Sequence, residues 1–384
     1  MPARSRRLGE MEQSEIRWMT RECARVSGIN LGQGVCDTPT PPFVAEAARA
    51  AIAAGRCQYS LPEGIRELRE AIAADLARRE GIEADPEREI VVCAGASGAY
   101  AGVVFGLLDP GDGVLLPEPF YGYHRHEADL AGLEVQPVRT AAPRFALEEE
   151  ALRAALRPNS RAVVLCTPAN PSGHMLGERE LAAVAAVARE RDLLVVTDEI
   201  YQHFVYDGRR HLAPAAFEDL AARTVSIRGF SKVFSVTGWR LGYAFAPEPL
   251  ARPIVAVNDV YFVCAPTPLQ YGAAAGLAQG DAHYAALARD HQRRRDALCA
   301  ALREAGAAPV APDGAYYVLA DVSAWGKGTA RAAALDLLER AGVASIPGTA
   351  FWFGAEGERW LRFCFGKKDE VVDEACRRIA SYRP

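Results

Sequence analysis

The chain has 384 residues, 50% of them hydrophobic and 24% charged, so it can bury a large core and is expected to form more than one domain. A net charge of -5 and a pI near 5.9 give no electrostatic sign of nucleic-acid binding. Residues 1–26 are charged throughout and no run approaches ~18 apolar residues, so we expect no signal peptide, no membrane span and a cytoplasmic location.

The middle of the chain alternates short β-branched runs with longer Ala/Leu-rich segments of helical spacing. This pattern is typical of a mostly parallel sheet sandwiched by helices. We predict strands at residues 89–94, 113–117, 162–166, 193–197, 224–227 and 241–246. Between them we predict helices at residues 98–108, 148–156 and 178–191.

From residue 281 onward the pattern changes to that of an α+β unit. A long polar helix is followed by a strand at 316–321, a helix near 330–341, a strand at 361–365 and a closing helix. We expect this unit to pack with the N-terminal segment. The predicted fold is therefore α/β, with a large domain of residues 41–280 and a smaller α+β domain of residues 1–40 and 281–384.

Small and polar residues follow several predicted strands, at the edge where open parallel sheets place their ligands. The strand that ends at Ala94 runs into Gly95-Ala96-Ser97-Gly98 and a helix, so free backbone N–H groups and the helix dipole would face an anion. By itself such a run of small residues is more often a tight turn.

Asn170 follows the predicted strand 162–166, and Asp198 follows the predicted strand 193–197. Prolines on both sides would hold the Asn170 amide rigidly as a donor, although the same residues can form a simple proline-locked turn. Asp198 follows the very apolar run 193–197, where it could cap a helix. Alternatively, its carboxylate could pair with a pyridine nitrogen and keep that ring protonated.

Lys232 completes a set of groups that suits pyridoxal phosphate. That cofactor needs an amine for a Schiff base, an acid for its ring nitrogen, a donor for its ring oxygen and a cation for its phosphate. Lys232, Asp198, Tyr201 and Arg240 supply these four groups. No G-x-G-x-x-G follows a strand, and nine scattered cysteines without a C-x-x-C pair predict neither a disulfide framework nor a metal site.

Over nearly its whole length, from residues 29–34 to 361–363, the chain resembles the class I/II aminotransferases, the aspartate aminotransferase family of fold type I pyridoxal phosphate enzymes. The resemblance implies an aminotransferase that moves an amino group between an L-amino acid and a 2-oxo acid. It implies that Lys232 forms the Schiff base and removes the α-proton. It also implies that Asp198 pairs with the pyridine nitrogen while Asn170 and Tyr201 hold the 3-hydroxyl group.

The remaining cofactor-binding residues implied by the resemblance are Ala96, Ser97, Tyr121, Ser231 and Arg240. The Ala96 and Ser97 amides and Arg240 would bind the phosphate, and Tyr121 would stack on the pyridine face. Taken alone, Tyr121 is almost as readily explained as a core residue.

Substrate and assembly residues follow from the same resemblance. Arg362 corresponds to the arginine that binds the substrate α-carboxylate, with Gly34 and Asn170 beside it, and its planar fork suits a carboxylate. Tyr59 matches a tyrosine that reaches the phosphate of the neighbouring subunit, which implies a homodimer with shared active sites. Ser97 stands where some aspartate-specific relatives carry a lysine, which disfavours a dicarboxylic substrate.

Two other functions are compatible with this scaffold. Related proteins expel a β- or γ-substituent, so a C–S or other eliminating lyase, or another biosynthetic enzyme, is the second candidate. A non-catalytic sensor domain is a third, disfavoured because the set Lys232, Asp198 and Arg362 is complete.

Overall fold

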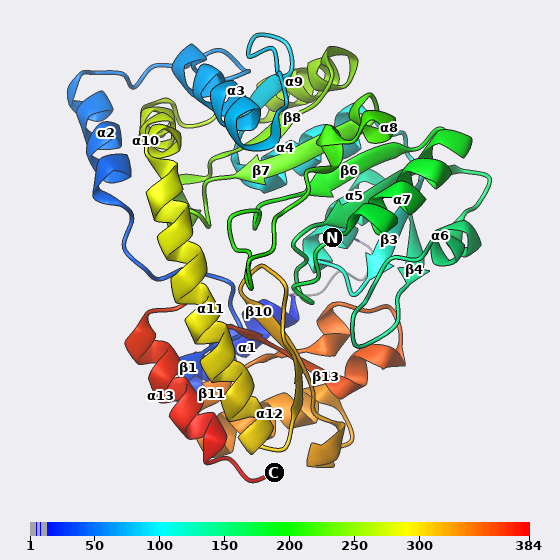
Figure 1. The fold of residues 1–384 in the computed structure, drawn as a ribbon, viewed down its shortest axis with the longest axis vertical. Helices are drawn as coiled ribbons and strands as arrows, with labels where there is room; N and C mark the ends of the chain where they lie inside the picture. The colour runs from blue at the N-terminus through cyan, green and yellow to red at the C-terminus, as the bar shows by residue number, and fades with distance from the viewer. Residues whose placement is uncertain (1–4, 6–7, 9–13) are drawn as a thin grey trace.

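The computed structural model describes residues 5, 8 and 14–384, which form a large helix-covered sheet and a smaller mixed unit below it (Figure 1). Most of residues 1–13, which belong to the predicted segment 1–40, lie outside the described residues. The domain boundaries near residues 41 and 280 stay a prediction.

The large sheet has seven strands in the order β2-β8-β7-β6-β5-β3-β4, and only β8 runs antiparallel to its neighbours. Its strands are β2 (Ile90–Cys93), β3 (Gly113–Glu118), β4 (Glu134–Arg139), β5 (Ser160–Cys166), β6 (Leu194–Asp198), β7 (Thr224–Gly229) and β8 (Gly242–Phe245). All six strands predicted in this region are present. β4 was missed because it is a half-exposed edge strand that contains Pro137.

Successive side chains of the central strands enter two different hydrophobic cores. In β5, Val164 packs into the core beneath the helices 95–106, 122–131 and 248–262, whereas Val163 packs into the core beneath the helices 149–155 and 178–190. Both faces of the sheet are thus buried, as its continuous apolar strands predict. The helices of this part are α2 (Pro42–Ala53), α3 (Arg66–Glu80), α4 (Gly95–Gly106), α5 (Gly122–Ala131), α6 (Glu149–Ala155), α7 (Glu178–Glu190), α8 (Glu218–Ala221), α9 (Glu248–Phe262) and α10 (Thr267–Ala278).

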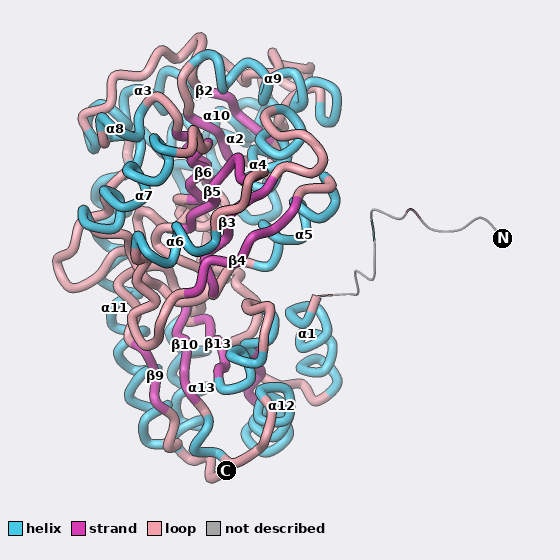
Figure 2. Tube along the Cα trace, turned by 90° about the vertical axis from the view of Figure 1, so that its right-hand side faces the viewer, coloured by secondary structure: helices cyan, strands magenta, loops and turns pink. Residues whose placement is uncertain are grey.

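The smaller unit combines the N-terminal segment with the last third of the chain (Figure 2). β1 (Ile29–Asn30) pairs in parallel with β11 (Val343–Ala344), and four further strands form the sheet β12-β13-β10-β9. These strands are β9 (Ala308–Val310), β10 (Tyr317–Asp321), β12 (Ile346–Pro347) and β13 (Trp360–Cys364). The helices are α1 (Glu15–Arg25), α11 (Gly280–Glu304), α12 (Ala330–Ala341) and α13 (Asp369–Ala380).

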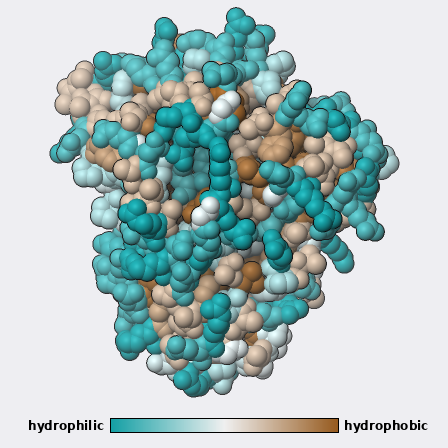
Figure 3. Space-filling model, in the orientation of Figure 1, coloured by the Kyte–Doolittle hydropathy of each residue, from teal (hydrophilic) through white to brown (hydrophobic). Residues whose placement is uncertain are grey.

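The surface is mostly hydrophilic on the side shown in Figure 3, and polar side chains border a hollow in its upper half. Among the residues that the structure describes, no helix is both long and apolar enough to cross a membrane.

Candidate active site

A cavity of about 410 Å³ opens where β5, β6 and β7 end and α4 begins, and the smaller unit closes it from the other side. The cavity is lined by eleven of the twelve residues predicted for the site: Gly34, Ala96, Ser97, Tyr121, Asn170, Asp198, Tyr201, Ser231, Lys232, Arg240 and Arg362. The exception is Tyr59.

One end of the cavity is built to receive an anion. α4 begins at Gly95, three residues earlier than predicted, so the N–H groups of Ala96 and Ser97 lie in its first turn. No side chain caps this helix. The Arg240 guanidinium lies against it, since a Cβ at Gly95 would come within 2.5 Å of Nη2. Helix dipole, free amides and guanidinium together suit a phosphate.

Lys232 lines the cavity, and its side chain is half-buried there. Its Nζ donates a hydrogen bond to the Gly34 carbonyl at 2.9 Å. Burial, assisted by the charge of Arg240, lowers the pKa of Lys232 below its usual value. A larger fraction of the amine is therefore neutral at a given pH, and only the neutral amine is a nucleophile or a base.

Asp198 ends β6 and is fixed from two sides. Its Oδ2 lies 3.0 Å from Nε2 of His124, and its Oδ1 accepts a hydrogen bond from the Ile200 N–H at 3.2 Å. The interpretation of Asp198 as a helix cap is wrong, because residues 200–203 form turns rather than a helix.

His124 was missed by the sequence analysis. It lies on α5, three residues after Tyr121, and the two rings meet edge to face with centroids 5.3 Å apart. The only signal in the sequence was this i, i+3 spacing, which places the two residues on one side of the helix.

Asn170 contacts Arg362 and also lines the cavity near Asp198 and Lys232. Its Oδ1 accepts a hydrogen bond from Arg362 Nη1 at 2.8 Å, which leaves its amide NH₂ as the group available for a ligand. The Tyr201 hydroxyl lies 2.9 Å from the Tyr317 hydroxyl. Burial and the neighbouring Tyr317 hold the pKa of Tyr201 well above its usual value, so its phenol keeps the proton that it can donate.

Arg362 is a buried cation, 1% exposed. Nη2 donates to the Gly32 carbonyl at 2.6 Å, and the guanidinium lies between the rings of Tyr317 and Phe351, 4.4 and 4.8 Å from their centroids. Within the described residues no carboxylate forms an ion pair with Arg362, and its Nε has no hydrogen-bond partner. An uncompensated buried charge of this kind calls for an anionic ligand.

Glu127 is a second cavity residue that the sequence analysis missed. It lies on α5, one turn after His124. Burial and the charge of Asp198 raise the pKa of Glu127 to about 8. Its carboxyl group is therefore mainly neutral at pH 7.

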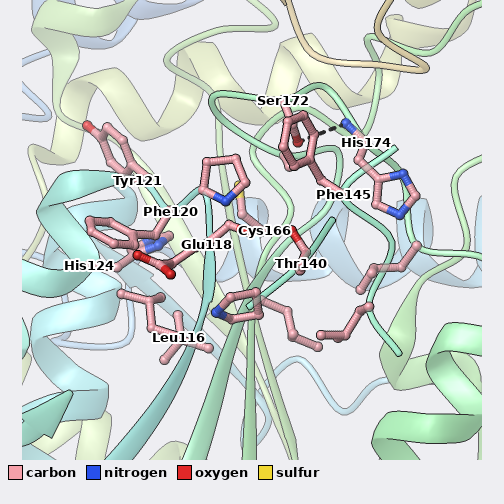
Figure 4. Close-up of a pocket in the computed structure, with 17 residues that line it drawn as sticks. Leu116, Glu118, Phe120, Tyr121, His124, Thr140, Phe145, Cys166, Ser172 and His174 are labelled. Atoms are coloured by element: carbon pink, nitrogen blue, oxygen red, sulfur yellow. Dashed lines mark hydrogen bonds between the residues drawn. The ribbon is translucent and has the colours of Figure 1, made fainter. Parts of the chain in front are cut away.

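Tyr121 and His124 also border a second, smaller cavity of about 50 Å³ (Figure 4). Phe120, Phe145 and Leu116 make much of its wall apolar. The space admits only molecules of about the size of water, so a substrate has room only in the larger cavity.

Tyr59 lies outside the cavity and is 80% exposed. Val260 and Tyr261 at the end of α9 are 82% and 60% exposed. Asn258 of α9 donates a hydrogen bond to the Pro62 carbonyl at 2.7 Å, which brings the segment that contains Tyr59 to α9. Adjacent exposed apolar residues of this size mark an interaction surface.

Pyridoxal phosphate fits this donor set. The anion cradle, the buried amine, the fixed carboxylate and the free Asn170 amide match its phosphate, aldehyde, ring nitrogen and ring oxygen. In the described part of the chain, no group of three His, Cys, Asp or Glu residues is arranged to hold a metal ion.

Comparison with known proteins gives consistent matches over the whole chain. A sequence model of the family described as aminotransferase class I and II matches residues 26–379. The chain is 39% identical over 373 residues to a probable N-succinyldiaminopimelate aminotransferase of Mycobacterium tuberculosis, covering 94% of each chain. It is 34% identical to an aspartate aminotransferase of Pyrococcus abyssi, covering 98% of this chain and 97% of the relative.

Solved structures agree with these sequence matches. The structure of the Mycobacterium tuberculosis N-succinyldiaminopimelate aminotransferase superimposes with a TM-score of 0.95 at 38% identity, covering 98% of this chain and 99% of that one. YbdL of Escherichia coli, with an identified methionine aminotransferase function, gives a TM-score of 0.95 at 29% identity and full coverage of both chains.

Proposed function

The chain belongs to the class I and II aminotransferases and so transfers amino groups with pyridoxal phosphate, and we propose that Lys232, Asp198 and Arg362 share the chemistry. The eliminating lyase is not favoured, because the relatives named above are aminotransferases. The single observation that carries the residue assignment is that the buried Arg362, which has no carboxylate partner among the described residues, lines the same cavity as the Lys232 amine.

Cofactor binding is assigned to the groups at the ends of the large sheet. The amides of Ala96 and Ser97 and the Arg240 guanidinium take the phosphate. Asp198, held by His124, takes the ring nitrogen. When bound, pyridoxal phosphate supplies an aldehyde that an amine can hold and a ring that withdraws electrons from the substrate α-carbon.

Proton transfer is assigned to Lys232. Its Nζ takes the proton from the α-carbon of the amino acid, which the lowered pKa of the amine favours. The Gly34 carbonyl, 2.9 Å from Nζ, orients the amine towards the cavity. Gly34 itself must lack a side chain, because a Cβ there would overlap the Tyr317 hydroxyl.

Substrate orientation is assigned to Arg362. An amino acid and a 2-oxo acid share only the α-carboxylate among their charged groups, so one arginine can position both partners of the reaction. Its bond to Asn170 couples this carboxylate site to the cofactor site.

For the substrate side chain we propose a preference for uncharged groups over short acidic ones. Ser97 itself places no cation beside the phosphate cradle, and Ile16, Val35 and Tyr317 contribute apolar surface to the cavity wall. Arg17 also lines this wall and would attract an acidic group, so acidic and uncharged donors must be compared directly. The named relatives act on aspartate, methionine or N-succinyldiaminopimelate, so the panel of amino donors should contain all three.

We further propose a cytoplasmic homodimer in which Tyr59 serves the site of the second subunit. The exposed apolar surface of Tyr59, Val260 and Tyr261 supports this assembly. Light scattering of the holoenzyme after gel filtration tests it, and a monomer at micromolar concentration would rule it out.

The decisive experiment is to incubate the holoenzyme with a panel of amino acids and to identify the products by mass spectrometry. If the enzyme transfers amino groups, the 2-oxo acid formed from the amino donor should accumulate only when a second oxo acid is added as the amino acceptor. Pyruvate or a thiol released without any acceptor would indicate elimination instead.

A further inference from the structure

Arg17, on α1 of the smaller unit, lines the active-site cavity together with the residues of the large sheet. α1 lies in the upper part of the smaller unit, on the side towards the large sheet (Figures 1 and 2). Arg17 stands in the first turn of this helix and is exposed, whereas Arg362 is only 1% exposed. The two arginines therefore lie at the rim and at the base of one cavity.

Among the described residues, four lysine and arginine side chains line this cavity, and three of them have a role in the proposed function. Arg240 takes the phosphate of the cofactor, Lys232 takes its aldehyde, and Arg362 takes the α-carboxylate of the substrate. Arg17 is the fourth. Within the described part of the chain no carboxylate forms an ion pair with it.

The carboxyl groups of the cavity wall leave the charge of Arg17 uncompensated. Asp198 and Glu127 are the acidic side chains that line the cavity within the described residues. Asp198 lies 3.0 Å from Nε2 of His124 and is assigned to the ring nitrogen. Burial and the charge of Asp198 raise the pKa of Glu127 to about 8, so Glu127 is mainly neutral at pH 7. An anion that pairs with Arg17 must therefore come with a ligand.

A series of hydrogen bonds fixes α1 relative to Arg362. Thr20 lies one turn after Arg17, and its Oγ1 accepts a hydrogen bond from Asn30 Nδ2 at 3.3 Å. Oδ1 of Asn30 in turn accepts from the Gly32 N–H at 2.9 Å. The Gly32 carbonyl accepts from Arg362 Nη2 at 2.6 Å. The backbone that carries Arg17 is thus placed at a defined position relative to the carboxylate site.

Packing holds α1 in the same position. Met19 and Cys23 are buried, at 0% and 2% exposure. The Arg331 guanidinium of α12 lies 3.9 Å from the centroid of the Trp18 ring. Arg17 thus projects from an anchored helix, and only its own side chain has to move to meet a ligand.

We propose that Arg17 is a specificity-determining residue, which binds a carboxylate at the far end of the donor side chain while Arg362 binds the α-carboxylate of the same molecule. The inference rests on the proposed function, because it takes Arg362 as the α-carboxylate site. The preferred donor is then a dicarboxylic amino acid with a side chain longer than that of aspartate, since it must extend from the base of the cavity to its rim. A guanidinium suits either carboxylate.

The first test is a calorimetric titration of the holoenzyme with adipate and with hexanoate, which have equal chain lengths but differ by one carboxylate. Arg17→Gln should lower the ratio of the two affinities about three- to tenfold, a modest effect because the arginine is exposed. The matched control is Arg21→Gln, because Arg21 is also exposed on α1 but does not line the cavity. It should leave the ratio as in the wild type.

The second test compares kcat/KM for L-2-aminoadipate and L-norleucine, which differ in the same way. Arg17→Gln should lower the ratio of the two values about three- to tenfold, and Arg17→Lys, which keeps the charge, should retain most of it. Equal effects of Arg17→Gln on both members of each pair would overturn the proposal, while continued transamination of norleucine would show that the proposed function holds. A wild type that prefers aspartate to 2-aminoadipate would overturn the assignment to a long side chain. If neither donor yielded an oxo acid, the proposed function would fail, and the adipate titration would still decide the role of Arg17.

Discussion

Replacing Arg362 by lysine is the most direct test of the substrate site. The lysine keeps a positive charge in the cavity but loses the planar fork. In the native site the fork donates to the Gly32 carbonyl at 2.6 Å and to Asn170 Oδ1 at 2.8 Å, and it lies between the rings of Tyr317 and Phe351. A single ammonium group cannot make these contacts and also grip a carboxylate with two parallel bonds.

The size of the effect follows from the number of bonds lost. A hydrogen bond to a charged group contributes about 1.5–3 kcal/mol. Losing one arm of the carboxylate grip, together with the loosened orientation of Asn170, should reduce transition-state stabilisation by about 2–4 kcal/mol. That loss corresponds to a decrease in kcat/KM of about 30- to 1,000-fold.

The assay compares kcat/KM for an accepted amino acid with that for its decarboxylated amine, in the wild type and in Arg362→Lys. Arg359→Lys is the matched control, because Arg359 lies three residues earlier, is half-exposed and pairs with Asp321 outside the cavity. We expect the loss for the amino acid alone. Equal losses for both substrates, with an unchanged cofactor spectrum, would refute a carboxylate-binding role.

Four further substitutions probe the rest of the site. Lys232→Ala should abolish the visible absorption of the lysine-bound cofactor and reduce turnover by orders of magnitude, and a variant that kept both would exclude Lys232 as the reacting amine. Asp198→Asn should retain the cofactor but slow α-proton removal, because a neutral amide cannot hold a proton on the ring nitrogen; a normal single-turnover rate would contradict this. Gly34→Ala should raise KM, since its Cβ would overlap the Tyr317 hydroxyl. An unchanged KM would show that the segment around residue 34 can shift without affecting substrate binding. Glu127, with its pKa raised from 4.5 to about 8, keeps a proton that the unfolded chain releases, so the wild type should lose stability from pH 4.5 to 8. Glu127→Gln should remove this loss, and parallel melting temperatures of the two proteins from pH 5 to 8 would disprove the effect.

Sequence reasoning succeeded for the parts of the fold in which local pattern and burial agree. The strands 162–166 and 193–197 are almost wholly apolar because helices cover both faces of the sheet, and the structure has β5 and β6 there. β4 and α5 were missed for the converse reason. β4 is an edge strand interrupted by Pro137, and α5 carries histidines and charges where an apolar stripe would normally stand.

In the site, too, residues within short sequence motifs were predicted, whereas contacts between distant residues were missed. Asp198 and Lys232 stand in recognisable local motifs, so the sequence predicted their place in the cavity. The contact between His124 and Asp198 joins residues 74 positions apart and depends on the angle at which α5 crosses the sheet. The surface groove between α3 and α11 is even less local, because its lining comes from these two helices and from the loop between β6 and β7.

With the predicted boundaries near residues 41 and 280, the described chain would pass between its two parts twice, and α11 begins at the second crossing. α11 is a continuous helix of 25 residues, about 37 Å long, that packs against α13 and β9. Besides these crossings, one hydrophobic core cluster that contains both Phe230 and Leu361 joins the two parts, so a tilt about the line through the crossings would be small. Such a tilt would change the separation of Arg362, on the smaller part, from Lys232, on the larger. A substrate that contacts both residues would restrict this motion. Small-angle scattering should therefore give a smaller radius of gyration for the enzyme with a bound carboxylate inhibitor than for the enzyme without it.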